Sequence, residues 1–446
     1  MKQDNLKTGI GFLPVDEVLK QRPVRLRATA MDNLMYQKIM YNDGQCRCVV
    51  RFDGRIDDQK LAVAVERSLI VTPILGYRFV YHPLRSHWQR CIRQEGWLPF
   101  RQIETRDPDY EIDRFITQPL DSEHKPQFAV WLLKSDTDYL CVKLSHFVVD
   151  AIGLLNYIRL LRNIYNRLLT DPDYMPYDYP QCERGLGQVV RSVGFPRLLK
   201  SMVHWHFPKL TWGIPAISDN YSGCAFPLRI IDKDQLAEIK ARCRNKKIKF
   251  TDLMIAAYLQ SLIDFLNPKN QAKLAIQLPI DLRTFLQNDT SLTIDDLSGA
   301  YFPIIRYSSG DNFEKTLRKL ETSLSKAKKD QLWFGGSLFL KIITLFPTYI
   351  QTVYGRKIIM KGVSAGLAHP TFSNLGIVDP KLFEFGKLTA VDVGLYGPVP
   401  YPPNFLVSAY SFQGKLYLLP GLCPAAVDPQ LVDGILDRLV KYMNLN

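Results

Sequence analysis

One short stretch, residues 139–155 (YLCVKLSHFVVDAIGLL), constrains the chain more than any other segment. Its first part, Tyr139–Leu144, is mostly apolar and predicts a buried strand. The run that follows, Ala151–Leu169, repeats apolar residues three and four positions apart, which is typical of an amphipathic helix. We therefore expect a rigid strand-to-helix corner that carries His146 and Asp150.

A histidine at such a corner suits general-base chemistry. Imidazole has an unperturbed pKa of about 6.5, so it can accept a proton near neutral pH. A neighbouring group can fix its tautomer and leave the other ring nitrogen to act. The alternative is structural: His146 is a hydrogen-bonded core histidine and Asp150 is the N-cap of the next helix. The spacing of the two residues allows both interpretations.

The segment Ser145–Ala151 resembles the HHxxxDG motif of the chloramphenicol acetyltransferase-like superfamily. That superfamily includes condensation domains of nonribosomal peptide synthetases, alcohol acetyltransferases, polyketide-associated acyltransferases and plant BAHD acyltransferases. The resemblance places the catalytic histidine on His146 and the motif aspartate on Asp150. Ser145 replaces the first histidine, which varies in the superfamily. Ala151 replaces the glycine, and its methyl group fits a helix start but not a turn with positive φ.

Further likenesses follow in the order of the superfamily: FDG with PIL near the N-terminus, then DLR, then SNLG. The DLR likeness implies that Arg283 pairs with Asp150 and fixes the corner; the alternative is a surface arginine at a strand end. Ser373 and Asn374 of SNLG could present donors to an oxyanion or contact the acceptor. An Asx turn between strands is the structural alternative for that pair.

The resemblance implies an α/β (mixed α+β) fold of two chloramphenicol acetyltransferase-like lobes with mixed sheets and a tunnel between them. A chain of 446 residues is long enough for two domains. We expect an N-terminal lobe over 1–180, a basic aromatic linker or crossover over 181–220, and a C-terminal lobe over 221–446.

Local patterns add four predictions about individual elements. Residues 45–52 alternate as a strand, and a turn at 135–138 joins two strands into a hairpin that ends at the corner. Residues 404–419 predict a second hairpin around Gln413 and Gly414. Thr251 is expected to be the N-cap of a helix that runs to Phe265.

The formal net charge of +13 favours acidic partners. The phosphates of coenzyme A, an acidic carrier protein and an anionic membrane surface all qualify, the last as a peripheral contact. No nucleic-acid-binding motif accompanies the charge, so we expect no nucleic-acid partner. One basic cluster could bind or steer the donor, or it could be a solvated turn. Its members are Arg242, Arg244, Lys246, Lys247 and Lys249.

The cysteines argue for a reduced protein without a metal site. The eight cysteines are scattered, and no CxxC motif pairs with a second one. The N-terminus lacks the hydrophobic run of a signal peptide, so we expect a cytoplasmic protein, and a monomer. The most apolar long stretch, Leu332–Tyr349, is shorter and more interrupted than a membrane-spanning helix requires.

The function that the resemblance implies is acyl transfer from a thioester to a hydroxyl or amine of a small molecule, with His146 as general base. Acyl-CoA, or an acyl group on the phosphopantetheine of an acyl or peptidyl carrier protein, would be the substrate, and no cofactor is needed. Two alternatives remain: a stand-alone condensation enzyme that forms amide bonds between carrier-bound substrates, and a non-catalytic member that binds carrier proteins. We do not expect a serine or cysteine hydrolase.

Overall fold

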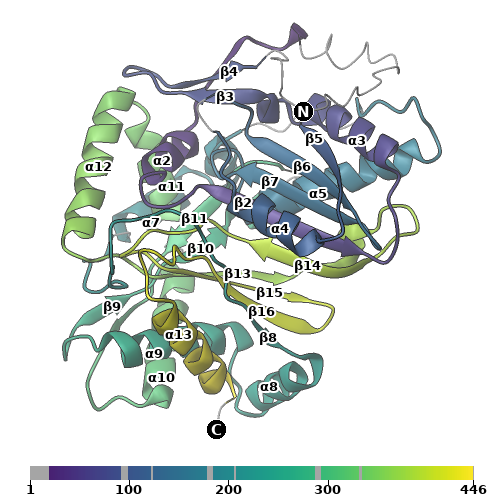
Figure 1. Cartoon of the computed structure of the whole chain (residues 1–446). Coiled ribbons are helices and arrows are strands. Elements are labelled where there is room, and N and C mark those ends of the chain that lie inside the picture. The colour runs from purple at the N-terminus through teal and green to yellow at the C-terminus, as the bar shows by residue number, and fades with distance from the viewer. Residues whose placement is uncertain are drawn as a thin grey trace.

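Two larger sheets organise the chain, each covered by helices (Figure 1). The computed structural model describes residues 20–91, 99–121, 124–177, 184–204, 207–286, 293–330 and 334–444. The mixed α+β, two-lobed fold class expected from the sequence is confirmed.

The first sheet has five strands. In spatial order they are β14 (Ala390–Tyr396), β2 (Gln45–Phe52), β7 (Tyr139–Ser145), β6 (Phe128–Lys134) and β5 (Phe100–Glu104). β5 and β6 are parallel and the other pairs are antiparallel, so the sheet is mixed. The expected strand over 45–52 and the hairpin of β6 and β7 are both confirmed.

Helices cover both faces of this sheet. α3 (Asp58–Val71) and α5 (Ala151–Leu168) pack together over the main core. α4 (Pro108–Thr117) lies against β7 and helps to form a smaller apolar cluster on the other face. α5 buries the apolar stripe that the sequence predicts, and this packing holds the end of β7 and the start of α5 in fixed positions.

The second sheet has four strands and a core of its own. Its strands, in spatial order, are β13 (Thr371–Ile377), β15 (Leu406–Phe412), β16 (Lys415–Pro420) and β8 (Arg229–Ile231). The helices of this half are α8 (Lys233–Asn245), α9 (Phe250–Leu266), α10 (Phe313–Asp330) and α13 (Pro429–Met443). The hairpin of β15 and β16 is confirmed, and Gln413 and Gly414 turn it with φ of 47° and 83°.

The predicted N-cap of α9 is wrong by two residues. The helix begins at Phe250, and Lys249 occupies the cap position without a side-chain hydrogen bond. Thr251 therefore lies inside the first turn. Burial of the apolar residues of α9 in the second core outweighs the contribution of a side-chain cap.

The two halves share a sheet. β14 comes from the segment expected to form the C-terminal lobe, yet it pairs with β2, with Gly394 opposite Val49. Tyr410 of β15 donates to the carbonyl of Val393 at 2.8 Å and so joins the two sheets. In the expected linker, α6 (Gly187–Val193) and α7 (Phe195–His204) are helical, while 181–183 and 205–206 lie outside the described residues. The domain boundaries themselves stay predictions.

Short elements complete the chain. The remaining strands are β1 (Arg25–Arg27), β3 (Tyr77–Val80), β4 (His87–Arg90), β9 (Lys273–Ala275), β10 (Leu278–Asp281), β11 (Ser298–Tyr301) and β12 (Ile304–Arg306). The remaining helices are α2 (Ala30–Lys38), α11 (Gly335–Ile343) and α12 (Thr348–Ser364). α12 stands beside α2 at one side of the molecule (Figure 1). Within the described ranges, no helix is long and apolar enough to cross a bilayer.

Candidate active site

The strand-to-helix corner is held from both ends. β7 ends at Ser145 and α5 begins at Ala151, so the expected corner is present. The backbone N–H of His146 donates to the carbonyl of Gly44 at 2.8 Å, and the N–H of Val148 donates to Ser145 at 3.0 Å. The three residues between the motif histidine and aspartate are buried in the main core. This packing presents the imidazole of His146 from a fixed backbone.

His146 faces a carboxylate that the sequence analysis did not identify. Its Nδ1 lies 3.2 Å from Oδ2 of Asp296, at ion-pair distance but without the alignment of a good hydrogen bond. The Asp296 side chain is 1% exposed and that of His146 is 20% exposed. Ser298 fixes the other oxygen of Asp296, through its backbone N–H at 3.0 Å and its hydroxyl at 2.6 Å. The carboxylate is therefore positioned independently of the histidine.

The two groups change each other's pKa. Burial alone lowers the pKa of His146, but the contact with Asp296 and its negative charge outweigh burial, and the net shift is upward. Burial likewise raises the pKa of Asp296, but His146 and the hydrogen bonds from Ser298 together more than reverse this, so the net shift is downward. The charge of Lys38 on α2 opposes the rise at His146. With its proton on Nδ1, next to Asp296, the ring has Nε2 as its basic nitrogen.

Asp150 points to a different set of partners. Its Oδ1 accepts from the N–H of Gly153 at 2.7 Å, which makes it the N-cap of α5. Its Oδ2 accepts from Nη1 of Arg283 at 2.8 Å and from the N–H of Leu297 at 2.9 Å. The expected contact between Asp150 and Arg283 is thus present, together with the capping role of the structural alternative. Ala151 starts the helix without positive φ, so its methyl group is accommodated.

Arg283 is a buried connector rather than a surface residue. Its side chain is 7% exposed and donates to Asp150, to Asp281, and to the carbonyls of Thr293 and Asp295. Burial alone lowers the pKa of Arg283, but the charges and hydrogen bonds of Asp150 and Asp281 together outweigh burial, and the net shift is upward. The guanidinium therefore ties the corner to the segment that leads into Asp296.

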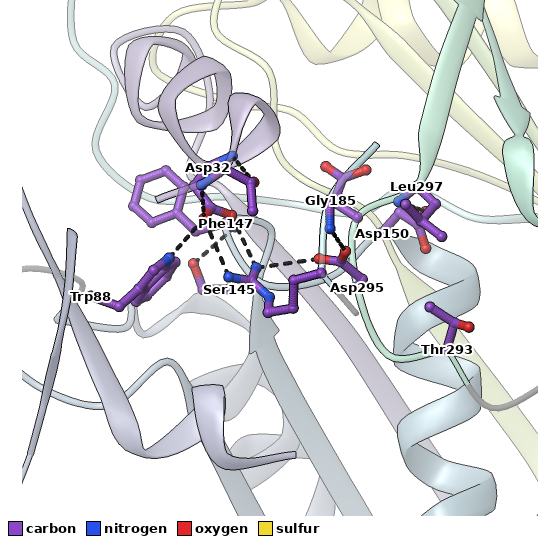
Figure 2. A network of polar contacts seen from close by, with 12 residues as sticks. Asp32, Trp88, Ser145, Phe147, Asp150, Gly185, Thr293, Asp295 and Leu297 are labelled. Atoms are coloured by element: carbon purple, nitrogen blue, oxygen red, sulfur yellow. Dashed lines mark hydrogen bonds and ion pairs between the residues drawn. The ribbon is translucent and has the colours of Figure 1, made fainter. Parts of the chain in front are cut away.

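A second buried network holds the same segment from the other side (Figure 2). Arg184 lies between two carboxylates, 3.0 Å from Asp32 and 3.3 Å from Asp295. Asp32 also accepts from Nε1 of Trp88 at 2.8 Å, and Asp295 accepts from the N–H of Gly185. Burial raises the pKa of Asp295 to about 7, although Arg184 opposes this. Asp295, the residue before Asp296, is thereby connected through Arg184 to Asp32 on α2 and through Gly185 to the expected crossover segment.

Ser373 and Asn374 lie on β13 instead of in a turn between strands. The register of β13 against β15 shifts between Asn374 and Ile377. The side chain of Asn374 accepts from the N–H of Gly376 at 2.9 Å, as in an Asx turn, and Gly376 has φ of 75°. In the part of the chain that the structure describes, which includes all three residues, neither side chain hydrogen-bonds to His146. Their role as oxyanion or acceptor contacts stays a prediction.

The basic cluster lies at the C-terminal end of α8 and in the turn that follows. Arg242 contacts Glu238 at 3.2 Å and donates to the backbone of Asn444. Lys247 adopts a positive φ of 56° in the turn. α8 packs beside β16 in the second sheet, away from β7 and α5 in Figure 1. A role in donor binding stays a prediction for this cluster.

One hydrolase-like pattern is present in the sequence and is not a nucleophile elbow. Residues 362–366 read GVSAG, which fits GxSxG. Ser364 is the last residue of α12, whereas the elbow requires a sharp turn from a strand into a helix. The pattern therefore gives no support to serine hydrolase chemistry.

Comparisons with known proteins find similarity in structure only. No family model matches the chain, and no curated protein sequence matches it. Among solved structures, the epimerization domain from the third module of tyrocidine synthetase B superposes with a TM-score of 0.68 at 16% identity. The match covers 94% of this chain and 95% of that one.

Two further structures, one of them an acetyltransferase, show the same similarity. A trichothecene 15-O-acetyltransferase from Fusarium sporotrichioides gives a TM-score of 0.69 at 12% identity, over 94% of each chain. Polyketide synthase associated protein 5 from Mycobacterium tuberculosis gives 0.64 at 15% identity, over 94% of this chain and 97% of that one. The chain therefore has the chloramphenicol acetyltransferase-like fold that the motif resemblance implied.

Proposed function

We propose that this protein is an acyltransferase that moves an acyl group from a thioester to a hydroxyl or amine, with His146 as the general base. The contact between His146 and Asp296 carries the proposal. It combines a partly exposed imidazole, a fixed backbone and a buried carboxylate 3.2 Å from Nδ1, whose charge favours the tautomer with the proton on Nδ1. Histidine with its tautomer fixed in this way is suited to remove a proton from a nucleophile.

The reaction divides into two proton transfers around one tetrahedral intermediate. Nε2 of His146 accepts the proton of the acceptor as its oxygen or nitrogen attacks the thioester carbonyl. The intermediate collapses, the carbon–sulfur bond breaks, and the imidazolium returns the proton to the leaving thiolate. Asp296 stabilises the imidazolium between these steps. General-base assistance of this kind contributes roughly 10²–10⁴-fold in rate.

The other site residues have supporting roles in this proposal. Asp150 and Arg283 hold the corner, because both are engaged with each other and with the backbone. Ser373 and Asn374 supply oxyanion or acceptor contacts. No covalent acyl-enzyme is needed, since the acceptor attacks the thioester directly.

The donor is proposed to be an acyl-CoA or an acyl group on a carrier protein. One structural neighbour, the starter condensation domain of rhizomide synthetase, was solved in complex with C8-CoA, with a TM-score of 0.64. Both kinds of donor carry phosphates or acidic surfaces, and the net charge of +13 favours their approach. The acceptor is a small molecule with a hydroxyl or amine.

A donor and acceptor screen tests the proposal. The full-length protein is incubated with mixed acyl-CoAs, or with acylated carrier proteins, and a panel of alcohols and amines, and mass spectrometry follows products and protein. Acylated acceptor and free thiol in equal amounts, with no acyl group retained on the protein, are expected. Thioester hydrolysis alone, or a stable acyl-enzyme, would contradict direct transfer.

A further inference from the structure

Helix α12 has its polar and apolar sides reversed relative to an ordinary surface helix. Its buried residues are Thr348, Gln351, Thr352 and Gly362, all small or polar. Its exposed large apolar residues are Tyr349, Ile350, Val353, Tyr354, Ile358 and Met360, with exposed fractions from 42% to 68%. We call these six residues the outer face of α12. A helix on a water-exposed surface normally shows the opposite pattern.

The inner side of α12 is fixed, so the outer face is a stable feature. Thr348 and Tyr349 donate their backbone N–H groups to the carbonyls of Leu84 and Pro83, at 3.0 and 2.7 Å. Gly355 packs so closely against Gln37 of α2 that a Cβ there would overlap the glutamine side chain. The helix cannot turn its apolar side inward without losing these contacts.

The apolar surface continues beyond the helix. Leu345 and Phe346, in the turn before α12, are 80% and 53% exposed. Leu84, whose carbonyl accepts from Thr348, is exposed as well. Of the 25 large hydrophobic side chains that are exposed in the described ranges, ten fall between residues 339 and 360. Such a concentration marks an interaction surface rather than the scattered exposure of any soluble protein.

The charges on α12 and in the sequence on either side of it are of one sign. α12 contains Arg356, Lys357 and Lys361 and no acidic residue, and the sequence has no Asp or Glu from 331 to 378. Lys357 and Lys361 are exposed and, by helical periodicity, lie among the six apolar residues. Lysine can extend its charge to a phosphate layer while its stem packs on apolar neighbours.

We propose that α12 docks the protein on an anionic membrane surface. An in-plane helix with apolar and tyrosine side chains in the headgroup region and lysines reaching the phosphates matches the outer face. A second copy of this chain is disfavoured, because it would bring two basic faces together. The inference stands apart from the proposed acyl transfer and does not depend on it.

Vesicle sedimentation tests the docking. The full-length protein is mixed with phosphatidylcholine vesicles with and without phosphatidylserine, over a series of salt concentrations. We expect binding that requires phosphatidylserine and weakens as salt rises. Equal binding to both vesicles, or none to either, would overturn the proposal.

Two pairs of matched variants locate the contact. Lys357→Glu with Lys361→Glu should weaken binding by about 25-fold or more. Lys246→Glu with Lys247→Glu makes the same change in net charge in the turn after α8 and should weaken binding much less. Ile358→Glu should weaken binding roughly tenfold, and Ile217→Glu, at an isoleucine exposed elsewhere, should not.

These substitutions fall at exposed positions, and thermal unfolding checks that each variant is folded. If the two pairs of charge variants lost equal amounts of vesicle binding, net charge alone would explain the binding, and the assignment to α12 would be overturned. Sedimentation velocity without vesicles tests the alternative, which is self-association through the outer face. A dimer that Ile358→Glu dissociates, with vesicle binding unchanged, would assign the outer face to self-association instead.

Discussion

Nδ1 of His146 lies 3.2 Å from Oδ2 of Asp296, and the two residues come from different halves of the chain. His146 is fixed by the corner between β7 and α5, and Asp296 by Ser298 at the start of β11. The pair therefore exists only when both halves are assembled. Its net effect is to raise the pKa of the imidazole and to favour the tautomer with Nε2 as base.

Removing the charge of Asp296 should change both the rate and its pH dependence. His146 acts when neutral, so kcat/KM falls as pH drops below its pKa, which Asp296 raises. In Asp296→Asn that pKa falls, and the acidic limb of the kcat/KM profile should move to lower pH. The plateau should fall roughly tenfold or more, because the tautomer is no longer fixed.

The Asp296→Glu variant is the matched control, since it keeps the negative charge and only lengthens the side chain by one methylene group. It should keep the acidic limb closer to that of the wild type than Asp296→Asn does. An unchanged limb in Asp296→Asn, with a lower plateau only, would mean that Asp296 supports the fold and does not act on His146.

Asp150 and Arg283 should be coupled in stability. Removing one member of a buried ion pair commonly costs about 3–5 kcal/mol. Asp150→Asn and Arg283→Ala should each lower the free energy of unfolding in denaturant. The double variant should lose less than the sum of the two by more than about 0.5 kcal/mol, because one interaction is counted twice. Simple additivity would show that the contact contributes little.

Gly153→Ala should destabilise the corner even though alanine favours helices. Its Cβ would lie 2.7 Å from the carbonyl oxygen of Asp295 and 3.0 Å from Cβ of Val149. Overpacking of this kind costs about 1–3 kcal/mol, against a gain of about 1 kcal/mol in helix propensity. We expect a lower free energy of unfolding, whereas Gly310→Ala, which meets open space, should change it by less than about 0.5 kcal/mol. Equal effects would contradict close packing at Gly153.

The basic cluster at the end of α8 and in the turn that follows gives a kinetic prediction. If Lys246 and Lys247 steer an acidic donor, changing both to Glu should raise the KM for the donor and leave kcat near its original value. The effect should shrink with salt, because exposed charges are screened over about 8–10 Å at physiological ionic strength. An unchanged donor KM at low salt would identify the cluster as a solvated turn.

Local pattern and resemblance together predicted the corner well. The alternation in 45–52, the hairpin into the corner and the amphipathic stripe of α5 are properties of neighbouring residues, so the sequence carries them directly. The contact of Asp150 with Arg283 was expected only through the DLR likeness. Nothing in the spacing of those two residues required it.

The other features of the site and of the fold depend on the tertiary arrangement, which local sequence patterns do not carry. Asp296 has no local signature beyond an Asp-Asp pair. The pairing of β10 with β11 and the contacts of Arg283 and Arg184 with Asp295 bring it to His146. β14 comes late in the sequence but pairs with β2 in the first sheet, so the two sheets do not follow one another along the chain. The Lys249 cap shows the same limit, because burial of α9 decides where that helix begins.

The most direct test of the central claim is the single-turnover rate of acyl transfer in wild type and in His146→Ala. Each folded protein is used in excess over a thioester and the acceptor found for it, and product is followed by mass spectrometry. The account predicts a loss of roughly 10²–10⁴-fold in His146→Ala, with an unfolding temperature near that of the wild type. A transfer rate in His146→Ala close to that of the wild type would contradict His146 as the base.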